Sequence, residues 1–466
     1  MLATLTILYL LITVGVGIYT SRKINAAEDF ALAGRRLPFH LSLTAFFATW
    51  FGAETILGAS SQFAAKGFSG VIEDPFGASL CLILTGFIFV RYFYPKGYLS
   101  IGDFFRERYG PKTEFATSLL QALSYFTYSA AQFVALAIVL QTVTGQSFQG
   151  CLIAGTILVV TYTIFGGMWA LAFTDFFQAI VIILGLGILS VYLYRLLPKG
   201  YELSALIPES NSFLPQNTFR GWAEFSAAWM VMGFGSIPSQ DIFQRIMSAK
   251  SEKTAKWSAV SAGFLYLIIA MLPLFIVMLC LKVYGTEGIT NAQQIIPQMV
   301  LTHMPMPIQI VFFGALLSAI LSTASASLLA QATVIGENLI KPHTRILSNK
   351  EFLNLLRLLV FLVSIISVFI ALNFTSIFFL ASLSSSLILV TLFIPMLAGL
   401  WWKNTTYLSA WGSMISGLLI YGICYFNEME LMSVFWGFLS SVIGYALGCL
   451  IPVTKVLPSN NSLKNE

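Results

Sequence analysis

The residues most able to do chemistry in this chain are carboxylates and hydroxyls that lie inside long apolar runs. Glu54 stands in the stretch ATWFGAETILG, residues 48–58, and Asp175 in the stretch GGMWALAFTDFFQ, residues 166–178. A carboxylate in hydrocarbon is costly, so it needs a partner, a proton or a function. Glu54 could pair with a basic group from another segment or be protonated, and Asp175 could lie at a helix end that faces water.

A cluster of hydroxyls forms the second set of candidate ligands. Ser322, Thr323, Ser325 and Ser327 fall within two helical turns of the stretch ALLSAILSTASASLL, residues 315–329. Hard cations prefer oxygen ligands, and hydroxyls and carbonyls suit a monovalent cation that must bind and leave again. Such residues also occur at ordinary helix interfaces in membranes, so this cluster alone allows either interpretation.

The composition requires these residues to be positioned by membrane-spanning helices. Of 466 residues, 57% are hydrophobic and only 10% are charged, and apolar runs of eighteen or more residues recur along the chain. We therefore expect an all-α polytopic membrane protein with about thirteen transmembrane helices. These helices are expected at residues 2–20, 39–64, 69–92, 114–143, 149–166, 170–194, 221–245, 257–282, 306–336, 353–373, 375–402, 406–426 and 432–452.

The distribution of basic residues predicts the orientation. Alternate loops carry most of the lysines and arginines, which by the positive-inside rule places the N-terminus outside and the C-terminus in the cytoplasm. We expect one transmembrane domain, residues 1–452, and a short cytoplasmic tail, residues 453–466. Compact loops favour a bacterial inner membrane, as a multi-pass plasma-membrane protein. The sequence has no HExxH motif, no P-loop and no Cys/His cluster, so we do not expect an enzyme.

Two of the expected helices are interrupted at matching depths. The helix over 39–64 contains Gly52, and the helix over 221–245 contains GFGSIP, residues 233–238, at about the same distance from its start. The two would each open a successive unit of five helices. Paired breaks of this kind indicate a midplane binding site, where unwound carbonyls and helix ends face a ligand. Alternatively, these glycines serve close helix packing.

Several stretches together resemble the sodium:solute symporter family. They are GGMWALAFTDFFQ at 166–178, IPSQDIFQR at 237–245, ALLSAILSTASASLL at 315–329, PMLAGLWWKNTT at 395–406 and GSMISG at 412–417. The resemblance implies a LeuT-like fold of two inverted five-helix repeats, about 39–194 and 221–402, with one extra helix before and two after. It also implies sodium-driven import of a small organic solute by alternating access, with Na⁺ as coupling ion and no other cofactor, by a unit that works as a monomer.

The resemblance also implies ion-binding residues. The main sodium site would use the carbonyls of Ala48, Phe51 and Ala319 and the side chains of Ser322 and Thr323.

Some family members bind a second sodium ion, whose ligands match Asp175, Ser322 and Ser325 here. The next position is Ala326, where those members carry serine, and this departure leaves the second ion open. Asp175 could instead couple two helices.

The solute is expected beside the two breaks, and acidic residues there indicate a cation. Aromatic rings with a carboxylate suit an ammonium group through cation–π attraction. Several motifs resemble the choline-transporter branch, although Ser239 replaces a tryptophan that contacts choline there. Glu73 and Asp74 add negative charge early in the next helix, unless they face external water. The expected substrate-binding residues are Trp50, Gly52, Glu54, Tyr128, Phe234, Ser239 and Asp241.

The best candidate is therefore an organic cation or amine such as choline. Two alternatives stay open at this point. One is a zwitterionic or anionic solute, such as proline, another amino acid or pantothenate. The other is proton coupling through a protonatable Glu54.

Overall fold

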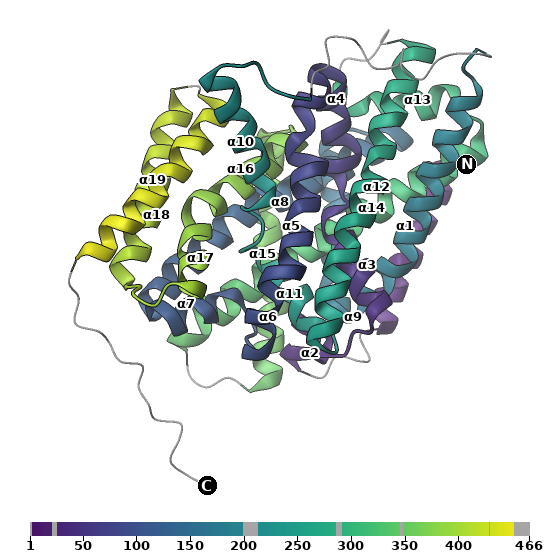
Figure 1. Ribbon diagram of the computed structural model, residues 1–466. Helices are drawn as coiled ribbons and strands as arrows, with labels where there is room; N and C mark the ends of the chain where they lie inside the picture. The colour runs from purple at the N-terminus through teal and green to yellow at the C-terminus, as the bar shows by residue number, and fades with distance from the viewer. Residues whose placement is uncertain are drawn as a thin grey trace.

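The computed structural model describes residues 2–20, 26–198, 213–285, 291–344, 348–427 and 429–451, and these residues form a bundle of helices (Figure 1). Nine helices in the described ranges are long and apolar enough to cross a membrane by length and composition alone. The all-α, multi-pass prediction is confirmed. The count of thirteen helices stays a prediction, and the expected tail at 453–466 lies outside the described ranges.

Within the described ranges, the first half of the chain supplies nine α-helices. In chain order they are α1 (Leu2–Thr20), α2 (Ala27–Leu32), α3 (Phe39–Trp50), α4 (Ser60–Lys66), α5 (Ala78–Leu84), α6 (Val90–Phe93), α7 (Ile101–Tyr109), α8 (Pro111–Thr144) and α9 (Phe148–Arg195).

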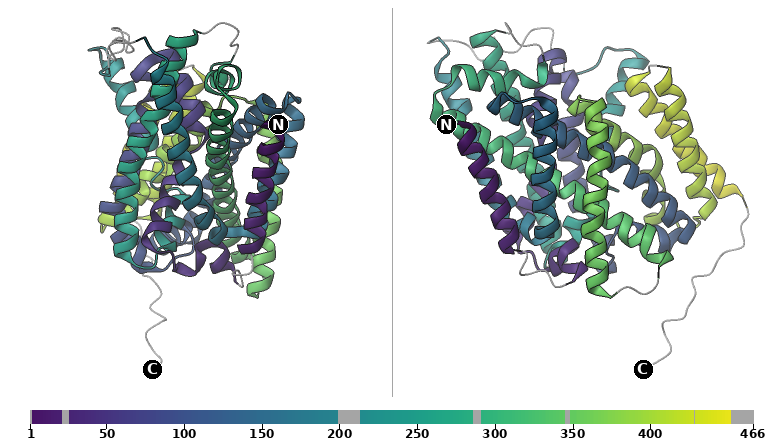
Figure 2. Two further views of the ribbon diagram at one scale, coloured as in Figure 1. Left: turned by 90° about the vertical axis from the view of Figure 1, so that its right-hand side faces the viewer. Right: turned by 180° about the vertical axis from the view of Figure 1, so that it is seen from behind.

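The second half supplies ten. They are α10 (Phe219–Gly233), α11 (Gln240–Ser248), α12 (Glu252–Tyr284), α13 (Ile295–His303), α14 (Met306–Val334), α15 (Asn349–Asn373), α16 (Ile377–Ile388), α17 (Ile394–Trp401), α18 (Tyr407–Phe426) and α19 (Glu430–Leu450). Helices α18 and α19 pack against each other at one side of the bundle, and α1 lies at the opposite side (Figures 1 and 2).

The range of α9 covers two of the expected helices. Gly167 interrupts it with φ 51° and ψ −159°, between the predicted ranges 149–166 and 170–194. A side chain at Gly167 would also meet Phe30, because an added Cβ would lie 2.8 Å from the Phe30 carbonyl oxygen. The positive φ and this close approach both require glycine here.

Helix α14 runs through the interior and packs against α8 and α9. Its central residues are alanine, serine and threonine, and small side chains let membrane helices approach closely. At one such contact Gly185 of α9 faces Ala315, where an added Cβ would lie only 2.8 Å from the Ala315 Cβ. Large apolar side chains such as Phe369 and Ile268 are exposed on the outside, as expected where a bundle meets lipid.

The two predicted breaks are both present. The first separates α3 from a π-helical segment, Glu54–Ala59, that leads into α4; the second separates α10 from α11. Just before α3, the Leu37 amide donates to the Ser248 carbonyl at the end of α11 (3.0 Å), and Lys250 donates to Leu37 (2.9 Å). The start of the first broken segment therefore lies beside the end of the second.

Candidate sodium and solute site

The first break exposes main-chain carbonyls in the middle of the bundle. Helix α3 ends because Phe51 adopts φ −79° and ψ 76°, and the Gly52 amide turns back to the Trp50 carbonyl at 2.9 Å. The Thr55 hydroxyl oxygen lies 3.2 Å from the same carbonyl. The indole nitrogen of Trp50 is buried and has no hydrogen-bond partner among the described residues.

The structure brings together three of the five residues expected at the main sodium site. The Thr323 hydroxyl lies 3.1 Å from the Ala48 carbonyl of α3 and 3.1 Å from the Ala319 carbonyl of α14. Two carbonyls and a hydroxyl are hard oxygen ligands of the kind that fits Na⁺. Ser322 points elsewhere, because its hydroxyl donates to Asp175 at 2.5 Å.

Oxygen atoms at the predicted second sodium site also lack partners. Asp175 Oδ2 and Ser325 Oγ are buried and have no hydrogen bond within the described ranges. The fully buried Arg245 competes with a cation there, because its guanidinium interacts electrostatically with both Asp175 and Asp241. The donor set fits a second ion, and this second ion stays a prediction.

Glu54 is fully buried and is held by neutral donors. The Tyr128 hydroxyl lies 2.8 Å from its Oε1, and the Gln132 amide nitrogen lies 2.7 Å from its Oε2. Gln132 is oriented by its own oxygen, which accepts from the Ala53 amide at 3.4 Å. No ion pair reaches Glu54 in the part of the chain that the structure describes. Glu54 and Tyr128 therefore lie together as predicted. The buried charge of Glu54 has no counter-ion within the described protein.

One face of α8 connects both breaks. Gln121, Tyr125, Tyr128 and Gln132 are spaced by four, three and four residues, which places them on one side of a helix. Tyr125 donates to Asp241 of α11 at 2.8 Å, and Gln121 donates to the Pro238 carbonyl at 2.9 Å. Tyr125, Gln121 and Gln132 were not among the predicted site residues, although this spacing is visible in the sequence.

A second buried carboxylate supports the part of the first broken helix that follows Gly52. Asp74 accepts from the Thr55 hydroxyl at 2.9 Å and from the Tyr266 hydroxyl of α12 at 2.5 Å. Asp74 is fully buried, so the alternative that it faces external water is wrong, whereas Glu73 is 5% exposed and lines a cavity. Pro75 explains the local break, because a residue before proline prefers extended backbone and Asp74 has φ −139° and ψ 118°.

Gly52 lies where the ion ligands and Glu54 meet. A Cβ added to Gly52 would lie 2.6 Å from Thr323 Oγ1 and 2.9 Å from Glu54 Oε2. The two oxygens therefore flank the same residue, and only glycine leaves both in place. Two other predicted residues have different surroundings: Phe234 stacks on Phe393 with ring centroids 5.2 Å apart, and Ser239 precedes α11.

Comparison with known proteins identifies this arrangement. The sequence profile of the sodium:solute symporter family matches residues 30–417, which include both breaks, α8 and α14. The chain belongs to the sodium:solute symporter family. The chain is therefore a multi-pass membrane transporter that uses Na⁺ and a small solute, and not an enzyme.

The curated relatives of this chain are sodium-coupled or choline transporters. The high-affinity choline transporter 1 of Torpedo marmorata is 27% identical over 441 residues, covering 89% of this chain and 75% of that protein. The human high affinity choline transporter 1 is 26% identical over 445 residues, covering 90% and 76%.

Solved structures confirm the fold. A Na⁺-coupled sialic acid symporter in a substrate-bound outward-open state superposes with a TM-score of 0.84 at 17% identity, covering 98% of this chain and 99% of that one. MhsT in complex with L-phenylalanine gives a TM-score of 0.58 at 14% identity, covering 88% and 98%. These are LeuT-fold transporters, so the predicted fold class is confirmed.

Proposed function

We propose that this symporter imports a small organic cation or amine, with choline as the first candidate. The observation that carries the proposal is Glu54, a fully buried carboxylate with neutral partners beside the Thr323 hydroxyl. A buried charge without a partner is strongly unfavourable. A bound ammonium group would supply the missing charge, and the choline transporters among the relatives support the same class of solute.

The proposed sodium ligands are the carbonyls of Ala48, Phe51 and Ala319 with the hydroxyls of Thr323 and Ser322. For Ser322 to join them, its hydroxyl must turn away from Asp175, to which it now donates. A sodium ion at Thr323 would lie next to Glu54, because both residues flank Gly52. This adjacency gives a direct electrostatic and steric route for coupling between ion and solute.

Proton coupling through Glu54 is the main alternative mechanism. The Gln132 amide is oriented so that its nitrogen donates to Glu54, which supports an ionised carboxylate that accepts hydrogen bonds. We therefore favour sodium. We further propose a monomeric transport unit in a bacterial inner membrane, with the N-terminus outside, the C-terminus in the cytoplasm and repeats at about 39–194 and 221–402.

The test is uptake of labelled choline into proteoliposomes, driven by an inward sodium gradient and compared with an inward potassium gradient. The proposal requires accumulation with sodium that unlabelled choline inhibits. Competition by proline, pantothenate and other solutes at equal concentration then ranks the substrate classes. Uptake that follows an imposed proton gradient and ignores sodium would overturn the coupling assignment.

A further inference from the structure

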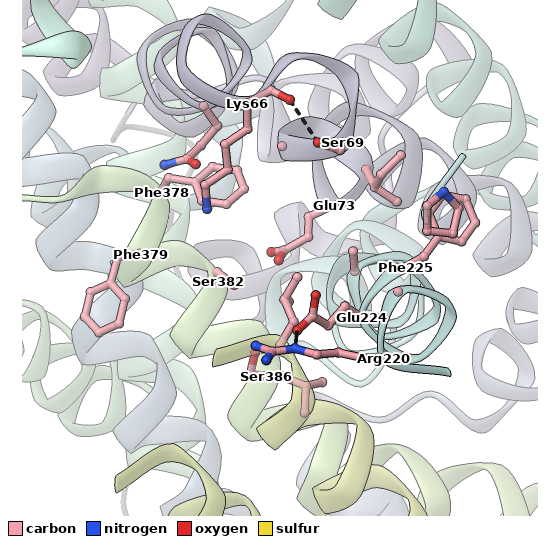
Figure 3. Close-up of a pocket in the computed structure, with 18 of the residues that line it drawn as sticks. Lys66, Ser69, Glu73, Arg220, Glu224, Phe225, Phe378, Phe379, Ser382 and Ser386 are labelled. Atoms are coloured by element: carbon pink, nitrogen blue, oxygen red, sulfur yellow. Dashed lines mark hydrogen bonds and ion pairs between the residues drawn. The ribbon is translucent and has the colours of Figure 1, made fainter. Parts of the chain in front are cut away.

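A second feature capable of binding an ammonium group lies apart from the Glu54 cluster. A cavity of about 750 Å³ is lined by residues of α4, α10, α16 and α18 (Figure 3). Helices α4 and α10 lie at the end of the bundle opposite α2 and α7 (Figure 1). Small-molecule sites commonly have volumes of about 300–1,000 Å³. Residues lining the cavity include Lys66, Glu73, Glu224, Ser382, Ser386 and Tyr421.

Glu73 is the buried charge of this cavity. Its side chain is 5% exposed, and its Oε2 has no hydrogen-bond partner among the residues described. Figure 3 shows the carboxylate pointing into the cavity toward Ser382. The extended backbone at Asp74 separates the neighbouring carboxylates: Asp74 is bonded inside the bundle, whereas Glu73 faces the cavity. An unpartnered buried carboxylate oxygen is costly unless a donor or cation occupies the space before it.

The other charges of the cavity lie at its exposed rim. Arg220 and Glu224 are paired on one turn of α10, with Nε and Oε1 2.8 Å apart, and most of the Arg220 side chain is exposed. Lys66 is exposed at the end of α4 and interacts with Glu73 only at longer range. Among these charges Glu73 is the one that is both buried and free of a direct ion pair in the described structure.

The remaining wall suits an organic cation better than a bare metal ion. Phe225, Phe378, Phe379, Tyr421 and Tyr425 supply aromatic rings, and two serines of α16 supply hydroxyls. Aromatic rings attract ammonium groups through the negative face of the π-system. A sodium site would need several convergent oxygens, and the cavity offers one buried carboxylate.

We infer that this cavity is a second binding site for ammonium-bearing solutes, with the Glu73 carboxylate as its charged ligand. The inference rests on the proposed function for the class of solute, and it adds a site separate from Glu54. Because the Ala48–Thr323 oxygens lie elsewhere, binding at Glu73 does not require sodium.

Equilibrium binding of labelled choline to the purified full-length protein tests this inference. The wild type should show a sodium-independent component in potassium buffer and a second component when sodium is added, giving two sites per chain. Glu73→Gln should weaken the sodium-independent component at least tenfold and leave the sodium-dependent one. Glu54→Gln should do the reverse.

Glu107→Gln on α7 is the control, since it removes the charge of a carboxylate that is paired with Lys96 and lies outside this cavity. It should keep both components, and Glu73→Asp should restore part of the sodium-independent one. The melting temperature of each variant reports folding. Absence of the sodium-independent component in the wild type, or a sodium-independent component unchanged in Glu73→Gln, overturns the inference. Loss of the sodium-dependent component in the wild type would instead contradict the proposed function, so the two failures are distinguishable.

Discussion

Replacing Glu54 with glutamine tests the central electrostatic argument. The substitution removes the charge and preserves the shape, and its oxygen can still accept from Gln132 while Tyr128 still has a partner. Two unit charges about 4 Å apart attract by about 4 kcal/mol at an effective dielectric constant of 20. Since about 1.4 kcal/mol corresponds to a tenfold change, Glu54→Gln should weaken choline binding by about two to three orders of magnitude.

Thermal unfolding of the purified protein provides a direct assay for this change. A ligand at one hundred times its dissociation constant stabilises the folded state by about 2.7 kcal/mol. If Glu54→Gln raises the dissociation constant a hundredfold, the same ligand concentration equals that constant and stabilises by only about 0.4 kcal/mol. The choline-induced shift in melting temperature, measured in sodium buffer, should therefore nearly vanish.

The control is Glu107→Gln on α7, a surface carboxylate that pairs with Lys96 and lies far along the chain from either break. It should keep the full shift. An unchanged shift and an unchanged dissociation constant in Glu54→Gln would refute the argument that the Glu54 charge binds the solute. The melting temperature without ligand separates this outcome from misfolding.

Three further substitutions test other parts of the site. Thr323→Ala should raise the sodium concentration for half-maximal uptake at least tenfold, because it removes the hydroxyl shared by two carbonyls, whereas Thr323→Ser should not. Gly52→Ala should abolish uptake, since its Cβ would lie 2.6 Å from Thr323 Oγ1. Gly187→Ala on α9 is the matched control for uptake, because its added Cβ would have no neighbouring atom within 4 Å. Gln132→Leu should lower the free energy of unfolding by about 1–3 kcal/mol, measured by melting temperature, because it leaves Glu54 Oε2 without a donor.

The helices and breaks could be predicted from the sequence because their signals are local. Apolar runs define the helices, and glycine and proline mark the interruptions at Gly52, Gly167 and residues 233–238. The break at Asp74 also had a local signal in the following proline, which was not used. The count of thirteen helices and the repeat boundaries stay predictions.

The partners of the buried carboxylates could not be predicted in the same way. Gln132 lies 78 residues from Glu54 in sequence, and Tyr266 lies 211 residues from Thr55. Which face of α8 or α12 meets the break depends on how each helix is rotated in the bundle, and nearly uniform hydrophobicity does not specify that rotation. The sequence predicts the Ser322 hydroxyl at both the main and the second sodium site. Only the packing of the helices decides which of the two it faces.

The choice of partners around the breaks fits transport better than simple helix packing. Glu54, Asp74 and Asp241 each accept a bond from a tyrosine: Tyr128, Tyr266 and Tyr125 respectively. Hydrogen bonds to a charged group contribute about 1.5–3 kcal/mol each, whereas burying an ion costs several kcal/mol. Neutral donors therefore offset much of the cost at Glu54 and leave its charge unneutralised. A lysine in place of Gln132 would permanently occupy the position of a transported cation. A protein that only packed helices would gain no stability by keeping a buried charge available.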